Sequence, residues 1–455
     1  MPMLRRPSFA TVLAFVLCAP SLASAASPDS PLACCADLEE RIAELEATAA
    51  NAGNRKVKLT VSGFLNEAIM FWDDGVERDA TVVTNDNGRG RFAFRGLAKI
   101  DKEWSAGFRL EVGVRIENSK RFNQETLGTG GLDVRHAIWF IESKTWGRIA
   151  LGNTGGAGEG ATEMNLAKTF DVAKYSDPED VALGLFLRRK DGSIVETPSG
   201  GFAWYRLLRD YGDQPGEGRR SDMVRYETPD IAGFIGLLNW GVDDAWEIGA
   251  RYKAEFQGLR MVAAATYGEN TFRRPTQGGY AFACLAELPG QPRDASCQQF
   301  GASASIMHDP TGLYANVAYG LAHDDLIEQT GRFRGVTGVE DESWFWAVEA
   351  GIQRKFMPIG TTTLFGQYYS DEGGSNARRN ILEGGVESRI LDTGYSYVGG
   401  GIVQMVDAAA LELYLYYRHS TAEMTILPGV ANNATPLALD LDDLDVVTAG
   451  ALIRF

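Results

Sequence analysis

Residues 107–118 read Gly-Phe-Arg-Leu-Glu-Val-Gly-Val-Arg-Ile-Glu-Asn. Apolar side chains stand at every second position from Phe108 to Ile116, and the positions between them carry charged side chains or glycine. Successive side chains of a β-strand point to opposite faces of its sheet. One face of this strand is therefore wholly apolar and the other is charged, so the strand separates water from an apolar environment.

The same two-residue period continues from residue 57 to the C-terminus, with clear examples at 91–101, 246–256 and 344–355. A soluble antiparallel sandwich also alternates in this way, so the period alone does not distinguish a protein core from lipid. Because the alternation occupies nearly the whole chain, the fold class predicted from the sequence is all-β.

The lengths of the links between strands separate the two environments. Short turns, such as 104–107 and 357–360, follow every second strand, and counting all links gives sixteen strands. Apart from a short link near 241–245, the other links are long: 73–90, 119–132, 154–221, 269–300, 323–342, 371–387 and 420–443. Short turns on one rim, long loops on the other and an even strand count are typical of a transmembrane β-barrel of the outer membrane.

The composition excludes several classes of protein. The chain has 455 residues, of which 45% are hydrophobic, so it is neither disordered nor collagen-like. Its 44 Lys and Arg against 60 Asp and Glu give a formal net charge of −16, and its longest basic run is only 188–190. We therefore expect no nucleic-acid partner.

The first 25 residues have the pattern of a secretory signal peptide. Arg5 and Arg6 precede an apolar run at 9–19, and 21–25 supplies small residues for cleavage. The apolar run is shorter than a membrane-spanning helix requires. The mature protein is thus predicted to be exported, and any membrane segment must be built from strands.

Residues 26–54 are predicted to form a periplasmic linker with one short α-helix at 37–50, ahead of a barrel at 55–455. Leu38, Ile42, Leu45 and Ala49 are spaced by four, three and four residues, which places them on one face of a helix. A helix of about two heptads is marginal alone in water. It either associates with copies of itself as a small coiled coil or remains a frayed tail.

Four cysteines remain after the signal peptide: Cys34, Cys35, Cys284 and Cys297. In an oxidising compartment, Cys284 and Cys297 are close enough in sequence to close a loop through a disulfide. The alternative is two unpaired thiols in a loop.

Several segments resemble a known family: 34–47, 55–63, 71–75, 135–144 and 224–226. The terminal Phe455 also lies on the apolar face of the last strand, which resembles the assembly signal of bacterial outer-membrane barrels. Together these segments are similar to the sixteen-stranded general porins of alphaproteobacteria, of the rhizobial type. The resemblance implies a homotrimer in the outer membrane of a Gram-negative bacterium, in contact with lipid and lipopolysaccharide, that passes ions and small hydrophilic solutes through water-filled channels. The loops depart from the family, so pore size and ion selectivity are left open.

The link at 154–221 is much longer than a hairpin needs. It follows the fifth strand, as the inward-folded constriction loop of general porins does, and we expect it to fold into the lumen. Its acidic residues would form one wall of a pore constriction: Glu159, Glu163, Asp171, Asp177, Glu179 and Asp180. The charged faces of the early strands would form a basic wall opposite: Arg91, Arg95, Lys99, Arg109, Arg115, Arg135 and Arg148. Opposed walls of charge would create a transverse field. Alternatively, the arginines only neutralise wall carboxylates such as Glu111 and Glu117.

Catalysis is not expected, because the four histidines (His136, His308, His323 and His419) are not placed with a nucleophile and an orienting carboxylate. No metal-ligand spacing appears, and no cofactor is expected. The acidic run at 440–445 could hold divalent cations that bridge lipopolysaccharide, or it could be solvated loop charge. Two other functions stay open: a substrate-specific channel, and a structural barrel tethered to the cell wall through residues 37–50.

Overall fold

The computed structural model describes residues 57–455 except 129, 209–213, 219, 242–244, 271–295, 326, 328–339, 374–379 and 430–433. These residues belong to one unit, Asn54–Phe455. The predicted signal peptide, the helix at 37–50, Cys34, Cys35 and Cys284 lie outside the described residues. Within the described part of the chain, no helix is long and apolar enough to cross a membrane.

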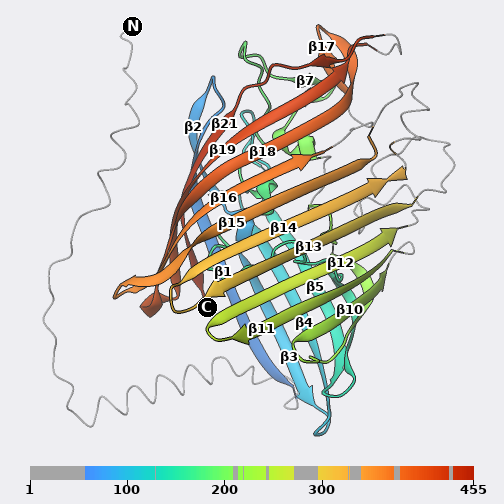
Figure 1. Cartoon of the computed structure of the whole chain (residues 1–455), viewed down its shortest axis with the longest axis vertical. Helices are drawn as coiled ribbons and strands as arrows, with labels where there is room; N and C mark the ends of the chain where they lie inside the picture. Colours follow the sequence, from blue (N-terminus) through green and yellow to red (C-terminus); the bar gives the residue numbers. More distant parts are fainter. Residues whose placement is uncertain are drawn as a thin grey trace, which may run out of the picture. The chain divides into compact units, whose positions relative to one another are not determined.

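Sixteen antiparallel strands form the wall, and each is hydrogen-bonded to the next in chain order (Figure 1). They are β1 (Lys58–Asp73), β3 (Arg91–Lys99), β4 (Trp104–Arg115), β5 (Gly131–Ser143), β6 (Gly147–Gly155), β9 (Arg220–Glu227), β10 (Phe234–Gly241), β11 (Trp246–Phe256), β12 (Leu259–Asn270), β13 (Cys297–His308), β14 (Leu313–Asp324), β15 (Glu342–Met357), β16 (Gly360–Glu372), β18 (Val386–Val406), β19 (Leu411–Leu427) and β21 (Leu444–Arg454).

The wall closes where the last strand meets the first. β21 pairs with β1 from Phe64 to Asp73, and the main chains of Gly63 and Phe455 exchange two hydrogen bonds of 3.0 Å each. A closed wall leaves no row of unpaired main-chain groups in lipid. The predicted sixteen-stranded antiparallel barrel is confirmed.

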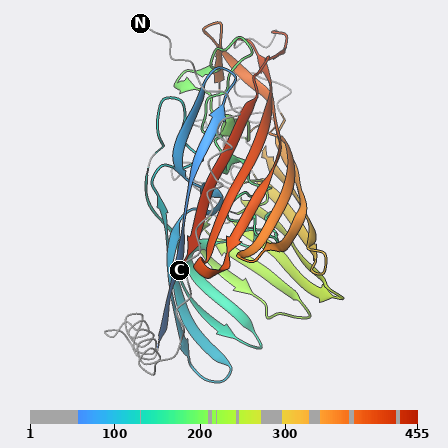
Figure 2. The ribbon, with the colours of Figure 1, turned by 90° about the vertical axis from the view of Figure 1, so that its left-hand side faces the viewer.

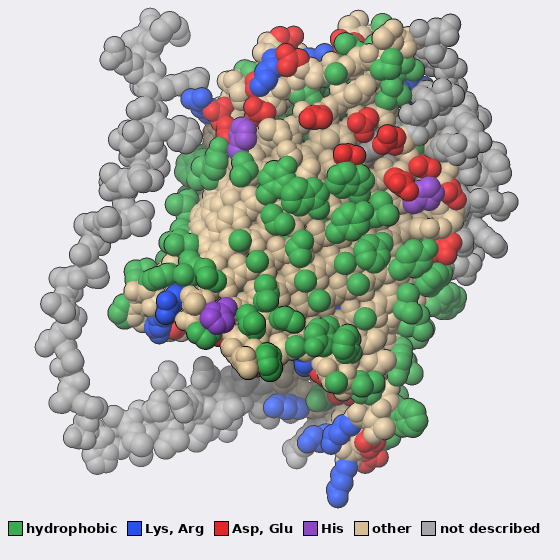
Figure 3. Space-filling model, in the orientation of Figure 1, with side chains coloured by type: hydrophobic (Ala, Val, Ile, Leu, Met, Phe, Trp, Pro, Cys, Tyr) green, Lys and Arg blue, Asp and Glu red, His purple; other side chains and the backbone are tan. Residues whose placement is uncertain are grey.

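The exposure of the side chains is inverted relative to a soluble protein. Leu110 is 39% exposed whereas the neighbouring Glu111 is 3% exposed. Hydrophobic side chains cover the middle of the wall face in Figure 3, and Asp and Glu gather along its upper rim. The apolar face of each strand therefore points outward, toward lipid, and the charged face points into the lumen.

The second wall strand is interrupted. The sequence predicts a loop at 73–90, but β2 (Arg78–Thr84) pairs with the outer part of β1 before the 3-10 turn η2 (Asp86–Gly88) leads into β3. Further short elements accompany the long loops: β7 (Glu196–Thr197), β8 (Gly200–Gly201), β17 (Asn380–Glu383), β20 (Leu437–Ala438), η3 (Pro178–Asp180) and η4 (Trp204–Leu208). The 3-10 turn η6 (Asp407–Ala409) forms the short link between β18 and β19.

Candidate functional site

The segment between β6 and β9, residues 156–219, is described except for 209–213 and 219, and its residues 156–188 are mostly buried inside the wall (Figure 2). Its apolar side chains are buried together with tyrosines that β16, β18 and β19 point inward. This shared cluster includes Val172, Ala173, Tyr175, Val181, Leu183, Leu185 and Leu187 of the segment and Tyr369, Tyr395, Tyr397, Tyr414 and Tyr416 of the wall. Burial of these apolar groups fixes the segment against one side of the lumen.

Polar side chains of the same wall hold the main chain of the segment. The hydroxyl of Tyr397 donates to the carbonyl of Tyr175 at 2.7 Å, and the amide of Gln367 donates to the carbonyl of Ala173 at 2.7 Å. Main-chain groups buried away from water must find such partners. Side chains of the late strands therefore hold the segment in its position inside the wall.

Two other wall strands, β10 and β13, hold the start of the segment. The side-chain oxygen of Asn239 accepts from the Ala157 amide at 2.6 Å, and the Ser303 hydroxyl accepts from the Met164 amide at 2.9 Å. The segment is therefore anchored on several wall strands, from β10 and β13 to β16 and β18.

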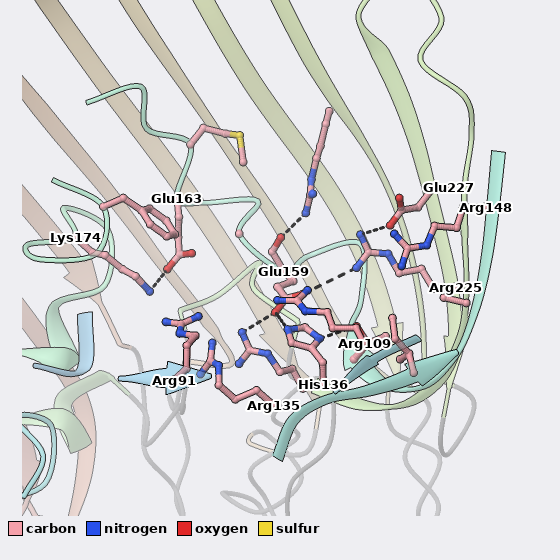
Figure 4. Close-up of a pocket in the computed structure, with 18 of the residues that line it drawn as sticks. Arg91, Arg109, Arg135, His136, Arg148, Glu159, Glu163, Lys174, Arg225 and Glu227 are labelled. Atoms are coloured by element: carbon pink, nitrogen blue, oxygen red, sulfur yellow. Dashed lines mark hydrogen bonds and ion pairs between the residues drawn. The ribbon is translucent and has the colours of Figure 1, made fainter. Parts of the chain in front are cut away.

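A cavity of about 440 Å³ lies between the segment and the early strands (Figure 4). Its lining is dominated by charged side chains from β3, β4, β5, β6, β9, β11 and the segment itself. The lining residues are Asn87, Arg91, Arg109, Arg135, His136, Ile138, Arg148, Ala150, Thr154, Glu159, Gly160, Glu163, Met164, Phe170, Lys174, Arg220, Arg225, Glu227 and Arg251.

Four of the seven predicted basic residues line this cavity, namely Arg91, Arg109, Arg135 and Arg148. Arg95 and Lys99 share a face of β3 with Arg91, but both are exposed and lie nearer the short turn that follows the strand. Arg115 lies toward the other end of β4 and forms an ion pair with Asp86 at 3.7 Å. These three basic side chains therefore do not belong to the lining of the cavity.

Two of the six predicted acidic residues line the cavity, Glu159 and Glu163. Asp171 instead forms an ion pair with Arg454 at 2.7 Å. Asp177, Glu179 and Asp180 are buried, where the ammonium groups of Lys120 and Lys174 neutralise them, with Lys120 on both Glu179 and Asp180. Half of the predicted acidic wall is therefore occupied in holding the segment together.

Other cavity residues were not predicted from the sequence: His136, Lys174, Arg220, Arg225, Glu227 and Arg251. Arg225, Glu227 and Arg251 lie on the charged faces of β9 and β11. They could have been predicted by the same alternation of apolar and charged positions that identified the basic residues of the early strands. Lys174 and Arg220 belong to the segment and to its junction with β9, where no period applies.

Glu111 organises the basic side of the cavity from behind. It is 3% exposed and forms ion pairs with Arg109 at 2.6 Å, Arg135 at 3.0 Å and Arg91 at 3.6 Å. The pairing of β4 with β5 shifts by one residue between Glu111 and Val112. Such a bulge re-aims side chains, and here it brings Arg135 onto the same carboxylate as Arg109.

Glu159 connects the segment to β9. Its carboxylate forms ion pairs with Arg220 at 2.6 Å and with Arg225 at 4.0 Å, and lies 3.6 Å from a ring nitrogen of His136. Burial alone would raise the pKa of Glu159, but the positive charges of Arg220 and Arg225 and the hydrogen bond from Arg220 lower it from 4.5 to about 2. Glu159 is therefore ionised at every physiological pH.

In the part of the chain that the structure describes, two groups of buried carboxylates come close enough together to be considered as metal ligands: Glu163, Asp177 and Glu217, and Asp177, Glu179 and Asp180. Lys174 contacts Glu163 at 2.5 Å and Asp177 at 3.5 Å, and Lys120 contacts Asp180 at 3.1 Å. The lysines already supply positive charge where a cation would bind.

The predicted disulfide is described only in part. Cys297, the first residue of β13, is disulfide-bonded. Since Cys284 lies outside the described residues, its pairing with Cys297 stays a prediction.

A closed barrel with an apolar exterior and a charged interior is typical of a channel of the outer membrane. The model of the Gram-negative porin family matches residues 10–434, and the chain belongs to that family. The chain therefore resides in the outer membrane of a Gram-negative bacterium. The resemblance to alphaproteobacterial members in particular stays a prediction.

Solved structures share the fold at low identity. An anion-selective porin from Comamonas acidovorans has a TM-score of 0.51 and 13% identity, covering 88% of this chain and 100% of that one. OmpT of Vibrio cholerae in a trimer form has a TM-score of 0.48 and 13% identity, covering 88% and 99%. OmpF of Salmonella typhi has a TM-score of 0.47 and 12% identity, covering 88% and 98%. No curated protein matches the chain.

Proposed function

We propose that the chain forms a passive, water-filled channel through which ions and small hydrophilic solutes diffuse across the outer membrane. The charged cavity inside the closed wall is the observation that carries this function. Barrels of sixteen strands are wide enough to keep an aqueous channel, and a lumen lined by guanidinium and carboxylate groups stays hydrated.

The segment at 156–219 acts as the constriction. It fills part of the lumen and leaves open the side where basic residues of the wall and acidic residues of the segment line the cavity. These are Arg91, Arg109, Arg135 and Arg148 of the wall and Glu159 and Glu163 of the segment. Solutes cross beside the segment, and their size limit depends on how firmly it is anchored.

The porin acts as a homotrimer in contact with lipid and lipopolysaccharide. Trimers are implied by the resemblance to general porins, and one neighbour of similar fold has a trimer form. The helix predicted from the sequence at 37–50 would associate with its copies or tether the barrel to the cell wall. Light scattering in detergent of the full chain and of a chain lacking 37–50 separates these roles, because a tether can be lost without loss of the trimer.

Flux of neutral sugars into liposomes tests the channel. Ala150 lines the cavity and is 4% exposed, whereas the next residue, Leu151, faces outward and is 41% exposed. We expect Ala150→Trp to slow the swelling of liposomes with sugars of increasing size, and Leu151→Trp to leave it unchanged. Heat-dependent migration on a gel checks that both variants fold.

Two results would redirect the proposal. Folded protein that gives no swelling with any sugar would favour the structural barrel. Flux that saturates with one solute alone would favour the substrate-specific channel.

A further inference from the structure

The cavity carries a large excess of positive charge, although the whole chain has a formal net charge of −16. Eight of the lining side chains are cationic and three are carboxylates: Arg91, Arg109, Arg135, Arg148, Lys174, Arg220, Arg225 and Arg251 against Glu159, Glu163 and Glu227. Arginine is charged at all relevant pH values. Counting Glu111, which lies behind the lining, still leaves a surplus of four positive charges.

The surplus arises because carboxylates are shared. Glu111 serves three guanidinium groups at once, those of Arg91, Arg109 and Arg135. One negative charge cannot neutralise three positive ones, so this side of the cavity keeps net positive charge even with every ion pair formed.

Two arginines of the lining form no ion pair with a described residue. Among the described residues, neither Arg148 nor Arg251 has a carboxylate oxygen within ion-pair distance. Arg148 stacks on the Phe140 ring at 3.9 Å, and Arg251 donates to the main-chain carbonyl of Glu159 at 2.6 Å. The Nε–H group of each is buried without a hydrogen-bond partner in the described part of the chain.

These cations enclose the passage from several elements. Arg91 and Arg135 point from the wall toward Lys174 and Glu163, and Arg148 and Arg225 stand together at the other end of the cavity (Figure 4). A guanidinium presents planar, paired donors that match the oxygens of phosphate, and converging positive charges are stabilised by an anion between them.

We infer that this cavity selects anions over cations and holds small dianionic oxyanions, with inorganic phosphate as the simplest member and phosphate monoesters sharing its chemistry. The inference rests on the proposed channel and names the class of solute that the channel favours. A dianion gains more than chloride from a lining with a surplus of positive charge. The local lining, and not the total charge of the chain, sets the selectivity.

Reversal potentials in a planar bilayer under a potassium chloride gradient test the selectivity. The full-length protein should give the sign of anion preference, and added inorganic phosphate should reduce the chloride current. Arg148→Gln and Arg251→Gln leave no carboxylate unpaired, so each should weaken the phosphate block about fivefold and move the reversal potential toward zero. Lys253→Gln is the matched control, because Lys253 lies two residues from Arg251 on β11 but pairs with Asp230 outside the cavity, at 2.9 Å.

Phosphorus NMR of inorganic phosphate with the protein in detergent measures binding without conduction. Line broadening that the wild type and Lys253→Gln cause, and that the double variant Arg148→Gln, Arg251→Gln loses, supports the inference even where no current is recorded. A cation-selective reversal potential overturns it, as does phosphate binding that is equal in the double variant and the control. A protein that binds phosphate in the cavity but never conducts contradicts the proposed channel alone.

Discussion

At the scale of single residues, the cavity depends on carboxylates that serve several cations. Glu111 touches three arginines from a position that is almost fully buried. Removing one partner of a buried charge cluster leaves the others uncompensated. The stability of the barrel and the charge of its lumen are therefore linked through this one side chain.

Glu111→Gln should lower the free energy of unfolding by about 2 kcal/mol, less than for a fully dry pair because the guanidinium groups are partly hydrated. Glu77→Gln should cost less than about 1 kcal/mol, since the Glu77 carboxylate is 54% exposed. Urea unfolding in detergent micelles compares the two. Equal losses would mean that Glu111 carries no special weight.

The low pKa of Glu159 predicts a pH dependence. A carboxyl whose folded pKa is depressed stabilises the folded state above its ordinary pKa and loses that contribution as pH falls through the folded value. The difference in thermal stability between wild type and Glu159→Gln should be constant from pH 8 to about 5 and shrink between about 4.5 and about 2. Melting curves at successive pH values measure it, and a difference that already fades near pH 6 would contradict the assignment.

At the scale of elements, the strands could be predicted from the sequence and the interior of the lumen only in part. The alternation between Phe108 and Ile116 is a local pattern, so a strand with one apolar face can be predicted from these residues alone. The buried carboxylates of Glu179 and Asp180 are neutralised by Lys120, some 60 residues earlier in the chain, so no local pattern reveals their burial. Arg135 likewise reaches Glu111 because of a β-bulge, which the two-residue alternation of the sequence does not predict.

Removing a single hydroxyl group should weaken the anchoring of the segment between β6 and β9. Tyr397→Phe removes the hydroxyl that donates to the Tyr175 carbonyl and should cost about 1 kcal/mol, with noisier single-channel currents as the segment moves more. Tyr368→Phe is the matched control, because Tyr368 is 38% exposed on the outer face of β16. Current recordings and melting temperatures of both variants test the anchor, and identical behaviour would argue against it.

At the scale of the whole molecule, the number of strands can be predicted from the alternation of short and long links. The sign of the charge that lines the lumen cannot be predicted from the net charge of the chain. Acidic side chains accumulate on the rim and inside the segment, and basic ones converge on the cavity. The amino-acid composition does not reveal where acidic and basic side chains gather, because their positions are set when the wall closes and one link folds inward.

The path of solutes through the lumen is tested most directly by charged, membrane-impermeant thiol reagents applied during single-channel recording. Ile138 lines the cavity, while the adjacent Trp139 is 50% exposed on the lipid face. Reagent should reduce the conductance of Ile138→Cys in discrete steps and leave Trp139→Cys and the wild type unchanged. Equal responses of the two variants, or no effect on Ile138→Cys, would contradict a water-filled path beside the segment.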